Sequence, residues 1–497
     1  MKIKKYRIGI TASLALLSAF MTIAVSAAND TQNSAGQCEL FNSAEILDES
    51  TLNIKVLKDW HVDKLTGTTR QKLIEINVAE WAPGQDYRIP VRMIVPLKGK
   101  AKGFHITGAN PYEGLMKGSK PSDFEAKLLA GGVGIVKTHV KAPRAIPGKK
   151  GLQGKMERLF IKELNPRYTT VWIWPMTLMR ATTAAYAETE YFEKGKVAGS
   201  GSSKNGISPA VALINDERFT ATHSDHAFAY FSPTRSGDRQ EVDKVDAANN
   251  AFFKAVKAGD IALKQKRAKW YQSVMVAGKR SMYKRAQKAG KSMDELQNLQ
   301  NCFGSKLYIT KHWDQLMKRD VDIFFQPGTH DYVAYDILWG AQNHAQLPVY
   351  YEPNGGHDQT PHDDSEKDEQ NKEAFLWQHF FGGESLLKPP TSSHKVNQNK
   401  LNVSVRFEQG TQPINGRIWW MYDRAPEGSA PFLHAPIPEE QSMEMEFDAK
   451  TGVWTADIEL QQGFSRIDFF SNHGLKVNGY KHYLSSPYTR VELPLNP

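Results

Sequence analysis

One short stretch limits what this chain can fold into more than any other. Two apolar residues, Val197 and Ala198, lead into a cluster of glycines and serines at 199–206 (GSGSSKNG), and an apolar run with helical spacing follows at 207–214. This pattern predicts a strand, a sharp turn and a helix. A serine at such a corner has its hydroxyl raised clear of the sheet, and the N–H groups of the helix start face the same point. The stretch therefore predicts that Ser203 is a nucleophile.

The match to a nucleophile elbow has one departure. The usual pattern is G-x-S-x-G, and Gly201 supplies the first glycine, but Asn205 stands in the second place and Gly206 comes one residue later. Asparagine accepts a positive φ more readily than most residues, so the elbow stays compatible with the sequence. A dinucleotide motif beginning at Gly199 would need a glycine at 204, and a phosphate-binding loop would need Ser or Thr after Lys204. An ordinary turn rich in small residues is the alternative that remains.

The N-terminus has the pattern of a secretory signal peptide. Four basic residues precede an apolar run from Ile8 to about Val25, and the small residues that follow this run predict cleavage after Ala27 or Ala28. An uncleaved membrane anchor is the alternative. No later stretch approaches the ~20 apolar residues of a membrane span. We therefore expect residues 1–28 to be removed and the mature chain to be secreted or periplasmic, without a stable membrane anchor.

Charge and cysteine content exclude several classes of protein. The chain carries 63 Lys and Arg against 54 Asp and Glu, a net charge of +9, and four of the basic residues lie in the leader. The mature chain is therefore near +5, which is too little for its length to indicate nucleic-acid binding. With only two cysteines, Cys38 and Cys302, a disulfide framework is excluded. One bridge between them and two unpaired thiols both stay open.

Strand and helix patterns alternate through much of the chain. After a polar, irregular arm (29–47), short alternating apolar runs indicate strands, and longer runs with helical spacing indicate helices. The expected strands are 73–78, 89–95, 103–107, 134–138, 219–223, 321–326 and 348–352, and the expected helices are 122–130, 174–192, 332–345 and 367–381. Such alternation is typical of a parallel α/β sheet. With the elbow, it predicts an α/β-hydrolase domain over 48–387.

The alternation stops between about 232 and 316. This region is rich in Lys, Arg and Ala with helical spacing, and it predicts a helical insertion that forms a cap over the carboxyl ends of the strands. The cap would shape the substrate pocket, with Trp270 and Tyr271 among its aromatic candidates. Its lysines could attract an anionic substrate, although a solvated outer helix face explains them more simply.

The chain after 387 has a different pattern. Residues 388–394 (KPPTSSH) contain two prolines and small polar residues and predict a linker. Short alternating runs separated by turns fill 395–497 and predict an antiparallel β-sandwich of immunoglobulin-like type. The neighbouring Trp419 and Trp420 suggest carbohydrate binding, but in a strand one of the pair must face inward and pack in the core. Because no catalytic candidate lies in this domain, we expect it to be dispensable for turnover of a small soluble ester.

A serine at an elbow needs a base, and an acid that orients the base. In an α/β-hydrolase the acid follows a late strand and the histidine follows the last one. The strand at 321–326 leads into PGTHD (327–331), and the strand at 348–352 leads into PNGGH (353–357). The carboxyl ends of parallel strands meet at one edge of the sheet. The order Ser203, Asp331, His357 therefore predicts a catalytic triad.

The roles follow from the chemistry of acyl transfer. The serine attacks the acyl carbonyl, the histidine takes its proton and returns it to the leaving group, and the aspartate fixes the imidazole tautomer. One oxyanion donor is expected to be the backbone N–H of Lys204, the residue after the nucleophile. The second should come from the loop after the third strand, where Gly108 and Ala109 are the candidates.

Other polar residues near these loops have competing interpretations. Asp225 and His226 follow the strand after the elbow and are candidates for the substrate pocket, with Phe228 and Tyr230. Asp225 is also the alternative catalytic acid. The run of His and Asp at 357–364 has no defined ligand spacing such as His-Glu-x-x-His, and a solvated loop explains it more simply. We therefore predict neither a metal nor another cofactor.

A resemblance to a known family follows from these motifs. The segments 174–181 (WPMTLMRA) and 201–206 (GSSKNG) resemble the PhoPQ-activated pathogenicity-related protein family, whose elbow has the form Gly-x-Ser-Lys-Arg-Gly. Here Asn205 replaces the Arg. The likeness spans about 50–490 and includes the Gly-Thr-x-Asp and Gly-Gly-His segments and the β-rich tail. It implies a secreted or periplasmic α/β-hydrolase.

These features together predict a secreted or periplasmic serine hydrolase that works through an acyl-enzyme. The expected substrate is a carboxylic ester, small or polymeric. The same triad cleaves amides, and proteins related to the family include one with dipeptidyl-peptidase-like activity, so an aminopeptidase or dipeptidyl-peptidase-like activity is the first alternative. The second alternative is a non-catalytic relative that binds a ligand through the cap and the sandwich, although such a protein has no need for three triad residues in order.

Overall fold

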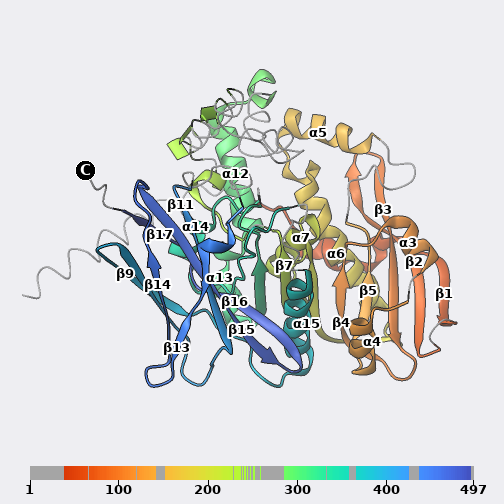
Figure 1. Cartoon of the computed structure of the whole chain (residues 1–497). Helices are drawn as coiled ribbons and strands as arrows, with labels where there is room; N and C mark the ends of the chain where they lie inside the picture. Colours follow the sequence, from red (N-terminus) through yellow and green to blue (C-terminus); the bar gives the residue numbers. More distant parts are fainter. Residues whose placement is uncertain are drawn as a thin grey trace, which may run out of the picture. The chain divides into compact units, whose positions relative to one another are not determined.

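A mixed eight-stranded sheet forms the centre of the structure (Figure 1). The computed structural model describes residues 38–64, 67–118, 120–140, 151–227, 229–236, 285–331, 333–357, 365–424 and 436–493, and single positions between 238 and 258. The predicted signal peptide lies outside these residues, as do Phe228, Trp270 and Tyr271. No helix in the described part of the chain is both long and apolar enough to span a membrane.

The strand order is β1-β2-β3-β5-β4-β6-β7-β8. The strands are β1 (Lys55–Val62), β2 (Thr69–Ala82), β3 (Gln85–Pro96), β4 (Ala101–Thr107), β5 (Gly134–Lys137), β6 (Phe192–Ser202), β7 (Ala221–Asp225) and β8 (Asp322–Gln326). The first three pair antiparallel, and those from β5 to β8 pair parallel. Two isolated parallel bridges, Phe325–Val349 and Gly328–Glu352, add the chain at 349–352 beside β8. This order, with a nucleophile elbow after β6, is that of an α/β-hydrolase, and the predicted fold class is confirmed.

The described helices are α2 (Ser43–Leu47), α3 (Tyr112–Lys117), α4 (Asp123–Ala130), α5 (Leu152–Glu163), α6 (Thr170–Ala187), α7 (Lys204–Asn215), α8 (Pro233–Ser236), α12 (Met293–Leu307), α13 (Trp313–Lys318), α14 (Ile337–Asn343) and α15 (Ser365–Phe381). Among them, α3, α4, α6, α7 and α15 pack against strands of this sheet. Helix α4 begins with a capping box in which Ser122 and Glu125 exchange hydrogen bonds of 3.1 and 2.8 Å. Helices α6 and α7 pack on each other, and α7 packs on β6 and β7, so the helix that follows the elbow is held against the sheet.

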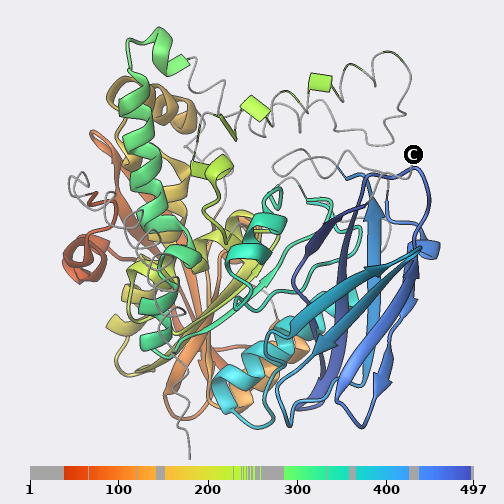
Figure 2. The ribbon, with the colours of Figure 1, turned by 90° about the vertical axis from the view of Figure 1, so that its left-hand side faces the viewer.

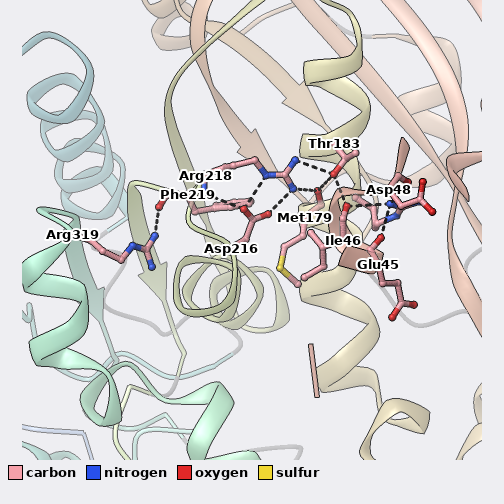
Figure 3. A network of polar contacts seen from close by, with 10 residues as sticks. Glu45, Ile46, Asp48, Met179, Thr183, Asp216, Arg218, Phe219 and Arg319 are labelled. Atoms are coloured by element: carbon pink, nitrogen blue, oxygen red, sulfur yellow. Dashed lines mark hydrogen bonds and ion pairs between the residues drawn. The ribbon is translucent and has the colours of Figure 1, made fainter. Parts of the chain in front are cut away.

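A buried polar network ties the N-terminal segment to α6 and to the turn after α7 (Figure 3). Arg180 of α6 donates to the carbonyl oxygens of Glu45, Ile46 and Asp48 at 2.7–3.1 Å. Arg218 follows α7, pairs with Asp216, and reaches back to α6 at two oxygens, each 3.0 Å away. Part of the arm that we predicted to be irregular is therefore helix α2, because the backbone oxygens at its end are paired with an arginine of the core.

The C-terminal region consists of two antiparallel sheets, drawn in blue in Figures 1 and 2. One has the order β13-β14-β10-β9, and the other has the order β12-β11-β15-β16 with β17 also on β15. The strands are β9 (Thr391–Asn397), β10 (Lys400–Arg406), β11 (Asn415–Tyr422), β12 (Ser442–Glu444), β13 (Glu446–Asp448), β14 (Val453–Glu459), β15 (Arg466–Val477), β16 (Tyr480–Ser485) and β17 (Thr489–Glu492). The predicted linker is shorter than expected, because its residues from Thr391 on pair with β10 as an edge strand. Polar side chains at the sheet edge hid this strand in the sequence.

The sandwich shares a core with the hydrolase domain. Helix α15 contacts β6, β7 and β8 as well as β16 (Figure 1). The buried cluster runs from Phe324 in β8 through Phe375 in α15 to Leu401 and Phe469 in the sandwich. A cut at 390 would expose this apolar surface, so the packing gives no support to our expectation that the sandwich is dispensable.

Several predicted boundaries differ from the structure. Helix α6 ends at Ala187 and not near 192, because the side chain of Glu188 turns to Lys72 and Trp60, at 2.8 and 2.7 Å, and Phe192 enters β6. Helix α14 is shorter than the helix predicted over 332–345. In the predicted cap, α12 packs on α7 and α8, and most of 237–284 lies outside the described residues, so a cover over the site stays a prediction.

Neither cysteine is a free thiol, since Cys38 and Cys302 are both disulfide-bonded.

Candidate active site

Ser203 lies at the corner between β6 and α7 in a strained conformation. Its φ is 60° and its ψ is −124°, a region that non-glycine residues rarely adopt and that costs of the order of 1–3 kcal/mol. Its N–H donates to the carbonyl oxygen of Asp225 in β7 at 2.9 Å, and its own oxygen accepts from Gly206 and Ile207 at 2.9 and 2.8 Å. The neighbouring strand and the first turn of α7 therefore hold the strain in place.

The glycines of the elbow are explained by close packing. A Cβ at Gly201 would lie 2.8 Å from the Cβ and the carbonyl oxygen of Asn205. A Cβ at Gly206 would lie 2.7 Å from the backbone oxygens of Asp225 and Gly201. The departure from G-x-S-x-G thus has a physical reason: the position that must approach β6 and β7 is 206, and a glycine stands there.

The structure brings the three predicted triad residues together. Ser203 Oγ lies 2.7 Å from His357 Nε2, and both carboxylate oxygens of Asp331 lie 3.1 Å from His357 Nδ1. Asp331 is fully buried, and its Oδ1 also accepts the N–H of Val333 at 3.0 Å. Hydroxyl, imidazole and carboxylate therefore form a continuous chain at the carboxyl edge of the sheet, in the geometry that activates a serine.

The candidate oxyanion donors lie around the same corner. Lys204 is the first residue of α7. Gly108 follows β4, and a Cβ there would lie 3.0 Å from Asn205 Oδ1, so the β4 loop packs directly on the first turn of α7. The carbonyl oxygen of Gly108 accepts from Val140, whereas the N–H groups of Gly108 and Ala109 donate to no residue in the described part of the chain. Their positions are compatible with the predicted role.

Asp225 is engaged elsewhere. Its Oδ1 lies 3.2 Å from Nδ1 of the buried His223, and its carbonyl oxygen supports Ser203. The carboxylate on His357 is that of Asp331, which favours Asp331 over Asp225 as the acid of the triad.

His226 forms a second imidazole–carboxylate pair beside the triad. Its Nε2 lies 3.2 Å from Glu352 Oε2 and its Nδ1 lies 3.5 Å from Ser202 Oγ, and its ring stands perpendicular to that of His357 at 6.3 Å. Its backbone φ is +46°, another strained position. Burial alone would lower the pKa of His226, but the contact with Glu352 and the charge of Asp331 outweigh this and raise it to about 9. The second imidazole is therefore a cation at neutral pH.

Two predicted pocket residues have different outcomes. Tyr230 is buried and packs on α14, where a Cβ at Gly340 would lie 2.2 Å from its ring, and it stacks on His344. This arrangement serves helix packing and gives no support to a pocket role. Phe228 lies outside the described residues. Sequence reasoning missed Glu352, although an acidic residue that ends a buried strand at the catalytic edge was a usable signal.

A separate pocket of about 340 Å³ lies between α5 and α12. Its lining is mainly apolar and includes Trp81, Phe160 and Phe303. No triad residue lines it among the residues described. No sequence pattern indicated this pocket, because α5 was not predicted. In the described part of the chain, no group of three or more His, Cys, Asp or Glu residues is arranged to hold a metal ion.

Comparison with known proteins finds distant structural neighbours. No family model matches the chain, and no curated protein matches it significantly. One similar structure is acetyl xylan esterase 1 from Thermoanaerobacterium sp. JW/SL YS485, with 14% identity, a TM-score of 0.38, and coverage of 69% of this chain and 93% of that chain. Candida antarctica lipase A has 10% identity, a TM-score of 0.32, and coverage of 67% and 82%. A puromycin-hydrolysing peptidase from Mycobacterium tuberculosis has 12% identity, a TM-score of 0.34, and coverage of 63% and 40%. The fold assignment itself rests on the sheet order and the elbow.

Proposed function

We propose that this chain is a serine hydrolase that cleaves carboxylic esters through an acyl-enzyme. The observation that carries the proposal is the unbroken contact chain from Ser203 Oγ through His357 to Asp331, at 2.7 and 3.1 Å. The strained φ of Ser203 supports the proposal. Such a conformation costs energy, persists only where the surrounding structure holds it, and is found mainly at functional sites.

The proposed reaction has two steps. His357 Nε2 accepts the proton of Ser203 as its oxygen attacks the ester carbonyl, and the imidazolium that forms is stabilised by Asp331. The tetrahedral oxyanion is held by the N–H of Lys204 and by an N–H of Gly108 or Ala109; loss of one such donor costs ~2.7–4 kcal/mol of barrier. Protonation of the leaving alcohol by His357 yields the acyl-enzyme, and water repeats the sequence to release the acid.

Membership of the PhoPQ-activated pathogenicity-related family and export by the leader remain part of the proposal. The motifs at 174–181 and 201–206 and the basic, apolar N-terminus support them. N-terminal sequencing of protein from an exporting host tests the second point, and a mature chain beginning near Ala28 is expected.

The test is hydrolysis of a panel of chromogenic esters and aminoacyl amides by the wild type and by Ser203→Ala. We expect ester turnover by the wild type and a loss of several orders of magnitude in the variant, with folding unchanged. Preferential turnover of the amides would move the assignment to the peptidase alternative. Equal rates for the wild type and Ser203→Ala would overturn the proposal.

A further inference from the structure

The loops that carry the acid and the histidine are joined into one unit. Thr329, two residues before Asp331, donates its N–H to the carbonyl oxygen of Glu352 at 3.0 Å. Its Oγ1 accepts the N–H of Asn354 at 2.9 Å, and the backbone N–H of His330 donates to the carbonyl oxygen of Gly355 at 2.8 Å. The position of either loop therefore depends on the other, and a displacement at Thr329 or Asn354 reaches both triad groups.

An arginine of the sandwich binds this unit. Arg424, just after β11, is 6% exposed, and its Nη2 donates to the carbonyl oxygen of Thr329. Its Nη1 lies 3.3 Å from Tyr488 OH, and Tyr488 in turn donates to Asp468 at 2.8 Å. A guanidinium is costly to bury, and here it is directed to a backbone oxygen of the catalytic loop.

A second contact clamps the histidine loop. The side-chain amide of Asn354 accepts the N–H of Ile437 at 2.6 Å and donates to the carbonyl oxygen of Ile437 at 3.1 Å. This pairing imitates a strand ladder between the loop and the segment that precedes β12. Asn354 is buried and has a φ of +61°, so the side chain and the turn conformation are both fixed three residues before His357.

We infer that Arg424 and Asn354 are positioning residues, through which the sandwich sets the geometry of the Asp331–His357 pair. The inference rests on the proposed function. It gives the C-terminal domain a role in the chemistry without a catalytic residue of its own. A shift of about 1 Å in a reacting group can cost about a hundredfold in rate, so loss of either contact should act mainly on the acylation step and little on substrate binding.

The variants are Arg424→Met and Asn354→Gly. The glycine accepts the positive φ, so Asn354→Gly removes the clamp without adding backbone strain. The control is Arg417→Met in β11, because Arg417 contacts only sandwich residues in the described structure, Ser442 at 2.6 Å and Glu444 at 3.0 Å among them. The readouts are the rate of Ser203 labelling by a fluorophosphonate, the pH profile of that rate, KM for a small ester, and the thermal midpoint.

We expect both test variants to be labelled ten- to a hundredfold more slowly, with an altered pH profile and a KM within about twofold of the wild type. The control should be labelled at the wild-type rate. If Arg424→Met does not fold, Asn354→Gly decides the question. Wild-type labelling rates and pH profiles in folded variants, even with lowered thermal midpoints, would show a merely structural role and overturn the inference. A wild type that is not labelled would instead overturn the proposed function, and this inference with it.

Discussion

At the level of single residues, the proposed triad depends on which carboxylate holds His357. Replacing Asp331 by Asn keeps the shape of the side chain, but its amide no longer holds the imidazole in the tautomer that accepts the serine proton. We expect Asp331→Asn to lower kcat by about three to four orders of magnitude. The matched variant is Asp225→Asn, at the other candidate acid, which should cost far less. A silent Asp331→Asn beside an inactive Asp225→Asn would reverse the assignment.

The second histidine of the site makes a prediction about alkaline pH. The pKa of His226 is raised in the folded chain to about 9, from ~6.5 in an unfolded chain. The stabilisation that protonated His226 gives the fold is therefore fully present below about pH 6.5 and is lost as the pH rises through about 9. The total is up to about 3 kcal/mol. The free energy of unfolding should fall between pH 7 and 10 in the wild type and fall less in His226→Gln. Identical pH dependence in the two proteins would contradict the ion pair with Glu352.

At the scale of elements, the elbow requires a close approach of α7 to β6 and β7. A Cβ at Gly206 would meet two backbone oxygens at 2.7 Å, and backbone cannot move aside cheaply. We expect Gly206→Ala to cost about 1–3 kcal/mol of stability and to lower activity, because it displaces the strained serine. Gly154 in α5 offers a matched control, since the nearest atom to its Cβ would be 3.6 Å away, and Gly154→Ala should be neutral or slightly stabilising. Denaturant titrations and ester assays of both variants measure this. Native stability and turnover in Gly206→Ala would be against the account.

How far the sequence predicted these elements depends on how local their signals are. The elbow, the buried segments that lead to Asp331 and His357, and most sandwich strands follow from short patterns of apolar and small residues. Helix α5 and strand β1 were missed, since β1 is largely exposed and has no clean apolar face. The contacts of Arg424 with Thr329 and of Ile437 with Asn354 join residues more than 80 positions apart. No local pattern predicts such contacts, and for that reason the role of the sandwich was not foreseen.

At the scale of the whole molecule, four buried histidines make a prediction about acid pH. Burial lowers the pKa of His105, His473 and His482 to about 3 and that of His223 well below its usual value. These groups stay neutral in the fold, while an unfolded chain protonates below ~6.5, so stability falls as the pH falls through that range by about 1.4 kcal/mol per unit for each histidine. Between pH 6 and 4, the free energy of unfolding of His482→Phe should fall by about 1.4 kcal/mol less per pH unit than that of the wild type. Denaturant unfolding at several pH values measures this. An unchanged slope would contradict this account of its burial.

The proposed mechanism requires an acyl-enzyme on Ser203, and this species can be trapped. The wild type is mixed with an activated ester, quenched in acid after a short time, and digested for peptide mass mapping, with Ser203→Ala as the control. We expect an acyl group on the peptide that contains Ser203, and none in the variant. The same adduct in both proteins, or its presence on a different residue, would contradict it.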